Sequence, residues 1–202
     1  MTEIKEKNPE TKVAVQSEKS RWRTMVALAF GYFVDQGEGQ AKSVLFPTLR
    51  SMWGLSFANL GLIGTIRNAL QSISAPIWGY IADRFPRKNV IVFGTGIWGI
   101  WTLLVGFTDN FGQLLVIRAI SGIGLGCLMP ATFSLMSDTF PPKKRGRALG
   151  IMEGIGTLGI VVSVLGLGFL ASPTLWRWGF FVLGGMSIIS GLVIWLRVEE
   201  PV

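Results

Sequence analysis

Six long apolar runs separated by short polar connections constrain this 202-residue chain more than any other feature. A helix needs about 20 mostly apolar residues to cross the hydrocarbon core of a bilayer. Such a segment must also satisfy its own backbone hydrogen bonds, which favours helices. The runs are Thr24–Leu45, Phe57–Ile81, Lys88–Phe107, Phe111–Met136, Ala148–Ala171 and Gly179–Leu196.

These runs predict an all-α membrane protein with two regions. Residues 24–202 form a domain of six transmembrane helices. Residues 1–23 mix Glu and Lys without an apolar run, so we expect a disordered cytoplasmic tail.

The composition supports a membrane protein and excludes several other classes. Charged residues make up 15% of the chain, against about 25% in an average soluble domain. The chain has no His and a single Cys, so we expect no disulfide framework, no metal site and no cofactor. It also has no phosphate-binding loop, dinucleotide fingerprint or nucleophile elbow, so we expect neither an enzyme nor an ATP-driven pump.

The basic residues predict the orientation in the membrane. The net charge is +7, but the cations lie between apolar runs rather than on one soluble element, so nucleic acid is not an expected partner. Fourteen Lys and Arg fall in the N-terminal tail, the second and fourth connections and the C-terminus, against two in the opposite loops. Because cytoplasmic loops are enriched in Lys and Arg, both termini are predicted to be cytoplasmic, in the plasma or inner membrane.

Two charged segments resemble known signatures. The connection Gly79–Lys88 carries Asp83 followed at once by cations, and it resembles the loop between the second and third helices of the major facilitator superfamily. Pro86 stands where that family usually has glycine. The stretch Ile117–Gly126, followed by Asp138–Arg147, is similar to the fourth helix of the same family and the loop after it.

The resemblance implies the N-terminal half of a major facilitator transporter, built from two three-helix repeats. Such proteins usually have two six-helix halves with the substrate between them. The charges of the two loops would hold helix ends together in one conformation and release them in another. Alternatively, they are topology determinants and solvated ion pairs. The residues assigned to this cytoplasmic gate are Gly79, Asp83, Arg84, Arg87, Lys88, Asp138 and Arg145.

Ionisable residues within the apolar runs are candidates for substrate or proton binding, since such groups are costly in a membrane. Asp35, Glu38 and Lys42 share one face of the first helix. A cavity lined by the first, second, fourth and fifth helices would bring the two carboxylates opposite Arg67 or Arg118. In the alternative, Glu38 pairs with Lys42 and the arginines only lock helices. The full candidate set is Asp35, Glu38, Arg67, Asn68, Gln71, Arg118 and Glu153.

Glycine pairs at a spacing of four residues are interpreted as packing positions. Gly122 and Gly126 in the fourth helix, and Gly150 and Gly154 in the fifth, would let neighbouring helices approach closely.

These features predict secondary transport of a small solute by symport or antiport. An arginine-lined site hints at an anion, and the membrane carboxylates suggest proton coupling. Six helices would leave one cavity wall missing, so we expect a second six-helix half or a homodimer, in contact with the lipid bilayer. The alternative is a truncated or regulatory membrane module without transport activity of its own.

Overall fold

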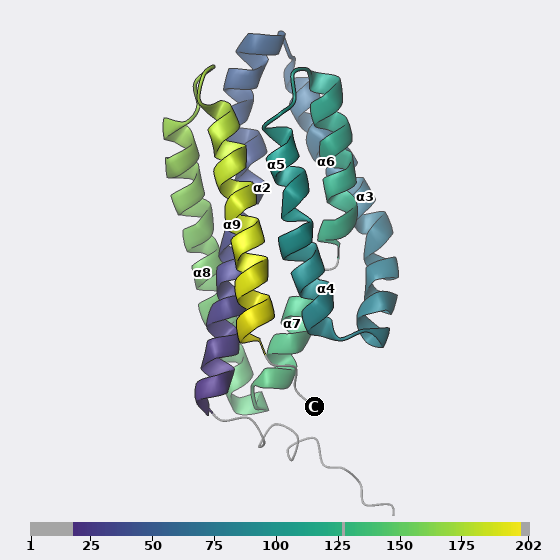
Figure 1. Cartoon of the computed structure of the whole chain (residues 1–202), viewed down its shortest axis with the longest axis vertical. Helices are drawn as coiled ribbons and strands as arrows, with labels where there is room; N and C mark the ends of the chain where they lie inside the picture. Colours follow the sequence, from purple (N-terminus) through teal and green to yellow (C-terminus); the bar gives the residue numbers. More distant parts are fainter. Residues whose placement is uncertain (1–17, 127, 199–202) are drawn as a thin grey trace, which may run out of the picture.

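The structure is a computed structural model that describes residues 18–126 and 128–198. Every regular element in these ranges is helical, and the long helices run up and down a common axis (Figure 1). The elements are α2 (Glu18–Trp53), α3 (Phe57–Arg84), α4 (Arg87–Val92), η1 (Phe93–Ile97), α5 (Gly99–Val105), α6 (Phe111–Leu125), α7 (Leu128–Thr139), α8 (Pro142–Phe169) and α9 (Trp176–Arg197).

The helices follow the six predicted runs, which confirms the all-α fold class. The segment α4–η1–α5 fills the third run and α6 with α7 fills the fourth. Among the described residues, three helices are long and apolar enough to cross a membrane: Arg87–Val105, Pro142–Phe169 and Trp176–Arg197. Helices α2 and α3 are long enough, but polar and charged residues such as Asp35, Glu38 and Arg67 lower their apolarity.

Helix α2 begins before the first predicted run. Residues 18–23, which we assigned to the tail, are helical, whereas residues 1–17 lie outside the described part of the chain. Two contacts hold this extension to the connection between α7 and α8: Lys144 Nζ lies 2.9 Å from Glu18 Oε1, and Trp22 packs edge-on against Phe140. The Lys144 ammonium lowers the pKa of the Glu18 carboxyl, so this contact weakens as the pH falls through the range of that group.

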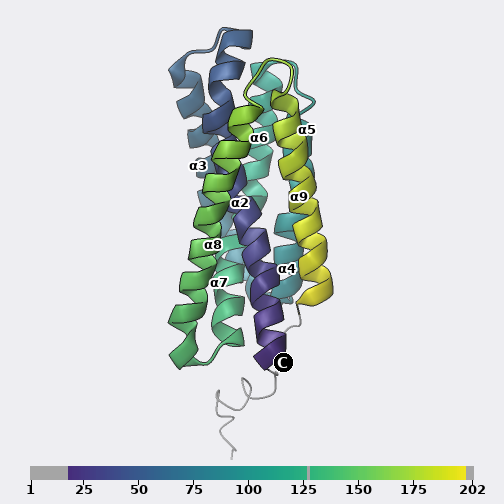
Figure 2. The same ribbon diagram turned by 90° about the vertical axis from the view of Figure 1, so that its left-hand side faces the viewer.

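The packing of the bundle is symmetric between its two halves. The first helix packs most extensively on the fifth (α2 on α8), and the fourth packs on the second (α6 on α3). The third packs on the sixth, with both α5 and η1 against α9. If the first helix is exchanged with the fourth, the second with the fifth and the third with the sixth, the first–fifth contact becomes the fourth–second contact and the third–sixth contact is unchanged. A pair of three-helix repeats requires this symmetry. In Figure 2, α2 lies beside α8. Helix α9 is on the right of that view and α3 on the left.

Two apolar clusters lie at opposite ends of the bundle. One contains Leu28, Leu135 and Met152 at the end where α2 begins. The other contains Leu45 and Trp176 at the end where α9 begins. The middle of α2, with its two carboxylates, therefore lies between two apolar layers.

Close helix contacts confirm one predicted glycine pair and correct the other. A side chain at Gly122 or Gly126 would meet the backbone of α3, so this pair does let α3 and α6 approach. Gly150 and Gly154 face open space, so their assignment as packing positions within this chain is wrong. The glycines of α8 that contact a neighbour include Gly159, which lies against the backbone of Phe33 in α2.

The third run contains a π-helical turn, η1, where it crosses α9. Gly96 in η1 lies directly against Gly191 of α9, and neither position has room for a side chain. Thr95 Oγ1 donates to the carbonyl oxygen of Ile91 one turn earlier. At this turn the Thr95 carbonyl also accepts a hydrogen bond from Ser187 Oγ of α9.

We predict that Gly159→Ala destabilises the bundle, because the added methyl would overlap the Phe33 backbone. Overpacking of this kind costs about 1–3 kcal/mol, so the thermal unfolding midpoint in detergent should fall. Gly154→Ala is the matched control on the same helix. It faces open space and should leave the midpoint unchanged or slightly higher. Equal midpoints for the two variants would contradict the close α2–α8 contact.

Candidate functional site

A buried ion pair joins α2 to α6. Arg118 Nη1 donates to Glu38 Oε1 at 2.9 Å, and the two side chains are 4% and 6% exposed. The Arg118 guanidinium also lies 5.1 Å from the ring centre of Phe180 in α9. Its second amino group, Nη2, is buried without a hydrogen-bond partner among the described residues. The arginine is therefore only half satisfied by its carboxylate.

Further charges surround this pair. Asp35 lies one turn before Glu38 and within electrostatic range of both Glu38 and Arg67. Lys42, one turn after Glu38, lies within range of Arg67 and Arg118, and its ammonium lies close to Gly64 of α3. The middle of the bundle thus brings two carboxylates together with three cations, which leaves a net positive charge when all are ionised.

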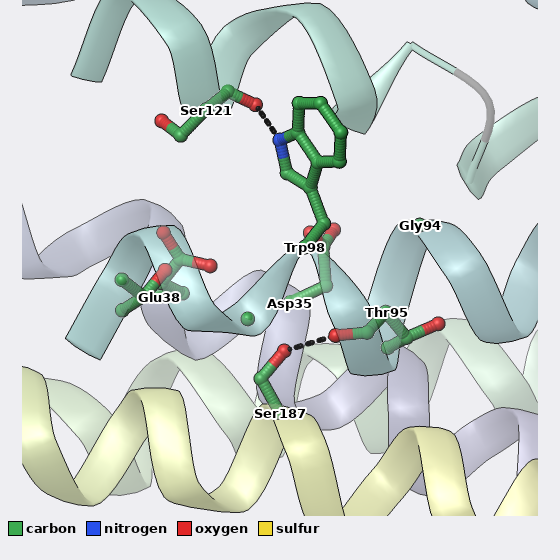
Figure 3. A pocket seen from close by; sticks show the side chains of 9 residues that line it. Asp35, Glu38, Gly94, Thr95, Trp98, Ser121 and Ser187 are labelled. Atoms are coloured by element: carbon green, nitrogen blue, oxygen red, sulfur yellow. Dashed lines mark hydrogen bonds between the residues drawn. The ribbon is translucent and has the colours of Figure 1, made fainter. Parts of the chain in front are cut away.

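A small polar cavity of about 10 Å³ lies beside the pair, enough room for one water. Figure 3 shows Asp35 and Glu38 on one side of it, facing η1 and α9. Two hydrogen bonds of 2.7 Å define its other walls: Trp98 Nε1 donates to the Ser121 carbonyl, and Ser187 Oγ donates to the Thr95 carbonyl.

This small cavity is not the central cavity that we expected between the first, second, fourth and fifth helices. It is lined by the first, third, fourth and sixth: α2, η1 with α5, α6 and α9. The larger cavity stays a prediction.

Other candidates lie on the side of the bundle formed by α2, α3 and α8. The hydroxyl of Tyr32 lies 3.1 Å from both carboxylate oxygens of Glu153, which is itself exposed. On α3, Asn68 is exposed and Gln71 is half-buried. The Arg67 Nε is buried without a hydrogen-bond partner among the described residues. Glu153, Asn68 and Gln71 are therefore not part of the Glu38–Arg118 cluster.

At the end of the bundle where α2 begins, the structure brings together two of the predicted gate residues. Arg87 at the start of α4 forms an ion pair with Asp138 at the end of α7. The Arg145 Nε donates to the Phe140 carbonyl at 3.0 Å. The Arg84 guanidinium lies 4.4 Å from the ring centre of Tyr80.

The remaining gate residues have different surroundings. Lys88 is half-buried in the first turn of α4. Gly79 faces open space. The side chain of Asp83 lies outside the described part of the structure. Pro86, which replaces the glycine of the family pattern, is the residue just before α4, and its carbonyl accepts from the backbone of Asn89.

Sequence reasoning missed several groups of the site. Tyr32 lies one turn before Asp35, so its place on that polar face was readable from the helical spacing. Phe180, Thr95 and Ser187 carry no such signal, because apolar and small hydroxyl residues are common in any membrane helix. Their role as neighbours depends on how α9 is rotated against η1.

Comparisons with known proteins agree with this architecture. The model of the Major Facilitator Superfamily matches residues 28–202. The chain is 30% identical over 190 residues to the 4-hydroxybenzoate transporter PcaK of Pseudomonas putida, covering 89% of this chain and 40% of that protein. It is 30% identical over 182 residues to the gentisate transporter of Corynebacterium glutamicum, covering 87% of this chain and 41% of that protein.

A solved structure supports the same conclusion. The bundle superposes with a TM-score of 0.81 and 27% identity on a bacterial homologue of the human lysosomal transporter Spinster, in its inward-facing and occupied conformation. The match covers 93% of this chain and 46% of that structure. The chain thus spans about two fifths to one half of the length of these relatives. Since the family model covers most of its residues, the chain belongs to the Major Facilitator Superfamily.

Proposed function

We propose that this chain provides one six-helix half of a proton-coupled secondary transporter for a small organic anion. The buried Glu38–Arg118 pair carries this proposal, because an arginine that is half satisfied in a membrane is a ready partner for a substrate carboxylate. The relatives named for 4-hydroxybenzoate and gentisate transport, both aromatic carboxylates, favour the same class of substrate.

The coupling follows from competition for one guanidinium. While Glu38 is ionised, it occupies one side of Arg118. Protonation of Glu38 removes that counterion, and the substrate carboxylate can take its place. Asp35 lies close enough to Glu38 for the charge on one carboxylate to affect the other. Proton and anion would then be bound in the same conformation and released together, which is the requirement for coupled alternating access.

The second half is inferred from a polar surface. Asn68 and Ser72 of α3 and Glu153 and Thr157 of α8 are exposed in the middle of long helices. Polar groups at this depth need partners other than lipid. We infer that the side of the bundle formed by α2, α3 and α8 faces the substrate path and a second six-helix unit, either another segment or a second copy. The orientation we propose has both ends of the chain in the cytoplasm.

We propose that the Arg87–Asp138 pair belongs to a cytoplasmic gate. It links the start of α4 to the end of α7, two elements that pack together at the end of the bundle that we assign to the cytoplasm. The side chains are 34% and 46% exposed, so the pair contributes about 0–1 kcal/mol. A contact this weak can be broken and remade within a transport cycle.

We predict that purified chain in liposomes takes up 4-hydroxybenzoate when an inward proton gradient is imposed, and that Glu38→Gln lowers this uptake at least tenfold. The amide cannot release a proton, so the gradient no longer drives the exchange of partners on Arg118. The measurement is initial uptake with and without a protonophore. Asp109→Asn is the matched control, because it makes the same change at the exposed Asp109–Arg177 pair. Absence of uptake by folded wild-type chain would exclude a transporter made of two copies of this chain, and would favour either a half that needs another six-helix segment or a module without transport activity of its own.

The double variant Glu38→Gln with Arg118→Gln separates transport from structure. Breaking a buried ion pair by removing one partner costs about 3–5 kcal/mol, whereas removing both is far less harmful. We predict that the double variant recovers the unfolding midpoint lost in Glu38→Gln but does not recover uptake. Recovery of both would mean that the pair only locks α2 to α6.

We predict that Asp138→Asn raises amide hydrogen exchange at the start of α4 and the end of α7 by up to about fivefold, as loss of about 1 kcal/mol allows. The charge swap Arg87→Asp with Asp138→Arg should restore protection. Lys144→Gln, which breaks the more exposed pair with Glu18, should leave these two segments unchanged. Identical exchange in Asp138→Asn and wild type would count against the gate.

A further inference from the structure

An open groove of about 730 Å³ lies between the beginning of α2 and the end of α9. Its walls are apolar side chains of both helices: Val26, Ala27 and Phe30 from α2, and Val193 and Leu196 from α9. Val26 is 60% and Leu196 63% exposed. Its volume falls within the usual range for ligand sites, about 300–1,000 Å³.

Two arginines lie at one end of this groove. Arg23 is on the second turn of α2 and Arg197 is the last residue of α9, and both are exposed. The two helices run in opposite directions, so these ends meet at the same end of the bundle (Figure 1). Within residues 18–126 and 128–198, neither guanidinium forms an ion pair or a side-chain hydrogen bond.

From the end with the two arginines, the groove continues along apolar side chains of α2 and α9. Phe30 lies seven residues beyond Arg23, about 10 Å along α2, and Val193 lies about 6 Å before Arg197 along α9. Trp22 lines the same end as the arginines, as an aromatic residue does at a membrane interface. Cations at the interface with an apolar channel beneath them match the shape and charge of a phospholipid.

A second apolar groove has no charged residues in its lining, unlike the α2–α9 groove. It lies between α4–η1–α5 and α9, has a volume of about 350 Å³, and is lined by apolar residues such as Ile97, Ile100 and Leu192. It could hold an acyl chain, but no charged residue lines it. Of these two grooves in the described part of the chain, the α2–α9 groove is the one that pairs an apolar channel with two guanidinium groups.

We propose that the α2–α9 groove binds an anionic phospholipid, with the phosphate between Arg23 and Arg197 and an acyl chain along Val26, Phe30 and Leu196. The inference rests on the orientation proposed above, which places this end at the cytoplasmic leaflet. Anionic lipids concentrate there, and each nearby Lys or Arg strengthens binding. By bridging the first and last helices, the lipid would fix the cytoplasmic ends of α2 and α9 relative to each other.

The test measures lipid binding to the purified full chain by native mass spectrometry in detergent, titrating phosphatidylglycerol against phosphatidylcholine with the same acyl chains. We expect phosphatidylglycerol to bind more tightly, and Arg23→Gln with Arg197→Gln to weaken its binding about tenfold or more. The matched control is Lys143→Gln with Arg147→Gln, which removes two exposed cations of the same cytoplasmic face outside the groove. It should leave the affinity within about twofold of wild type.

A second pair of variants tests the apolar part of the groove while all charges remain. Val26→Trp should fill the groove and weaken phosphatidylglycerol binding, whereas Ile100→Trp, in the uncharged groove, should not. Helical content by circular dichroism and the unfolding midpoint check that every variant is folded. Glycerol phosphate, which has the headgroup charge without a chain, should not compete at equal concentration.

Three results would overturn the proposal. Equal affinity for phosphatidylglycerol and phosphatidylcholine would show that the arginines do not recognise the headgroup charge. An equal loss of phosphatidylglycerol affinity in the Lys143/Arg147 control would show that only the net charge of the protein matters. A dimer that Val26→Trp abolishes, without any change in bound lipid, would assign the groove to a second copy of the chain. These readouts do not depend on transport, so failure here leaves the proposed function untouched, and loss of uptake leaves the lipid site untouched.

Discussion

The ion pair between Glu38 and Arg118 joins two helices that otherwise make little contact. Helix α2 packs on α8 and α9, and α6 packs on α3 and α5, but α2 and α6 are not among the extensively packed pairs. Their connection is a 2.9 Å contact between two side chains that are almost fully buried. A buried pair adds little net stability, but separating its members is costly. Helices α2 and α6 are therefore coupled mainly through charge, while the packing of α5 and η1 on α9 joins the two groups at the other contact.

The symmetry of the bundle explains why this pair occupies a special position. The first and fourth helices are equivalent when the two three-helix sets are exchanged, so the pair spans the pseudo-symmetry axis. Apolar clusters lie on either side of it along the bundle. The close approaches at Gly159 and Gly122 hold α8 against α2 and α3 against α6, so the two arms of the pair are positioned by backbone contacts rather than by flexible side chains.

The fold was largely predictable from the sequence because apolar run length and loop charge are local properties. The six runs, the Gly79–Lys88 loop and the Asp138–Arg147 segment were sufficient for the architecture and the family. The partners within the site were less predictable. That Glu38 would contact Arg118 rather than Lys42 depends on which way α2 faces. The hydrogen bond from Ser187 to the Thr95 carbonyl depends on a π-helical turn that the sequence pattern did not predict.

The same limit explains the error at Gly150 and Gly154. Their spacing is the one that lets helices approach, yet on α8 they face open space, and Gly156 and Gly159 make the contacts with α2 instead. A spacing of four residues defines one face of a helix, but it does not say whether that face meets a neighbour. Gly150 and Gly154 each lie three residues before an exposed polar residue, Glu153 and Thr157, so they belong to the face on which we infer the second six-helix unit.

Helix α2 shows how one helix can serve two different environments. Arg23, Val26 and Phe30, at i, i+3 and i+7, line the groove against α9. At about 100° per residue, Tyr32 and Ser43 lie roughly on the opposite face, toward α8 and the polar side of the bundle. Asp35 and Glu38 fall between these faces and point into the interior. A rotation or tilt of α2 would change all three surroundings at once. A lipid bound in the α2–α9 groove would therefore bear on the surroundings of the buried charges, because one continuous helix connects the two.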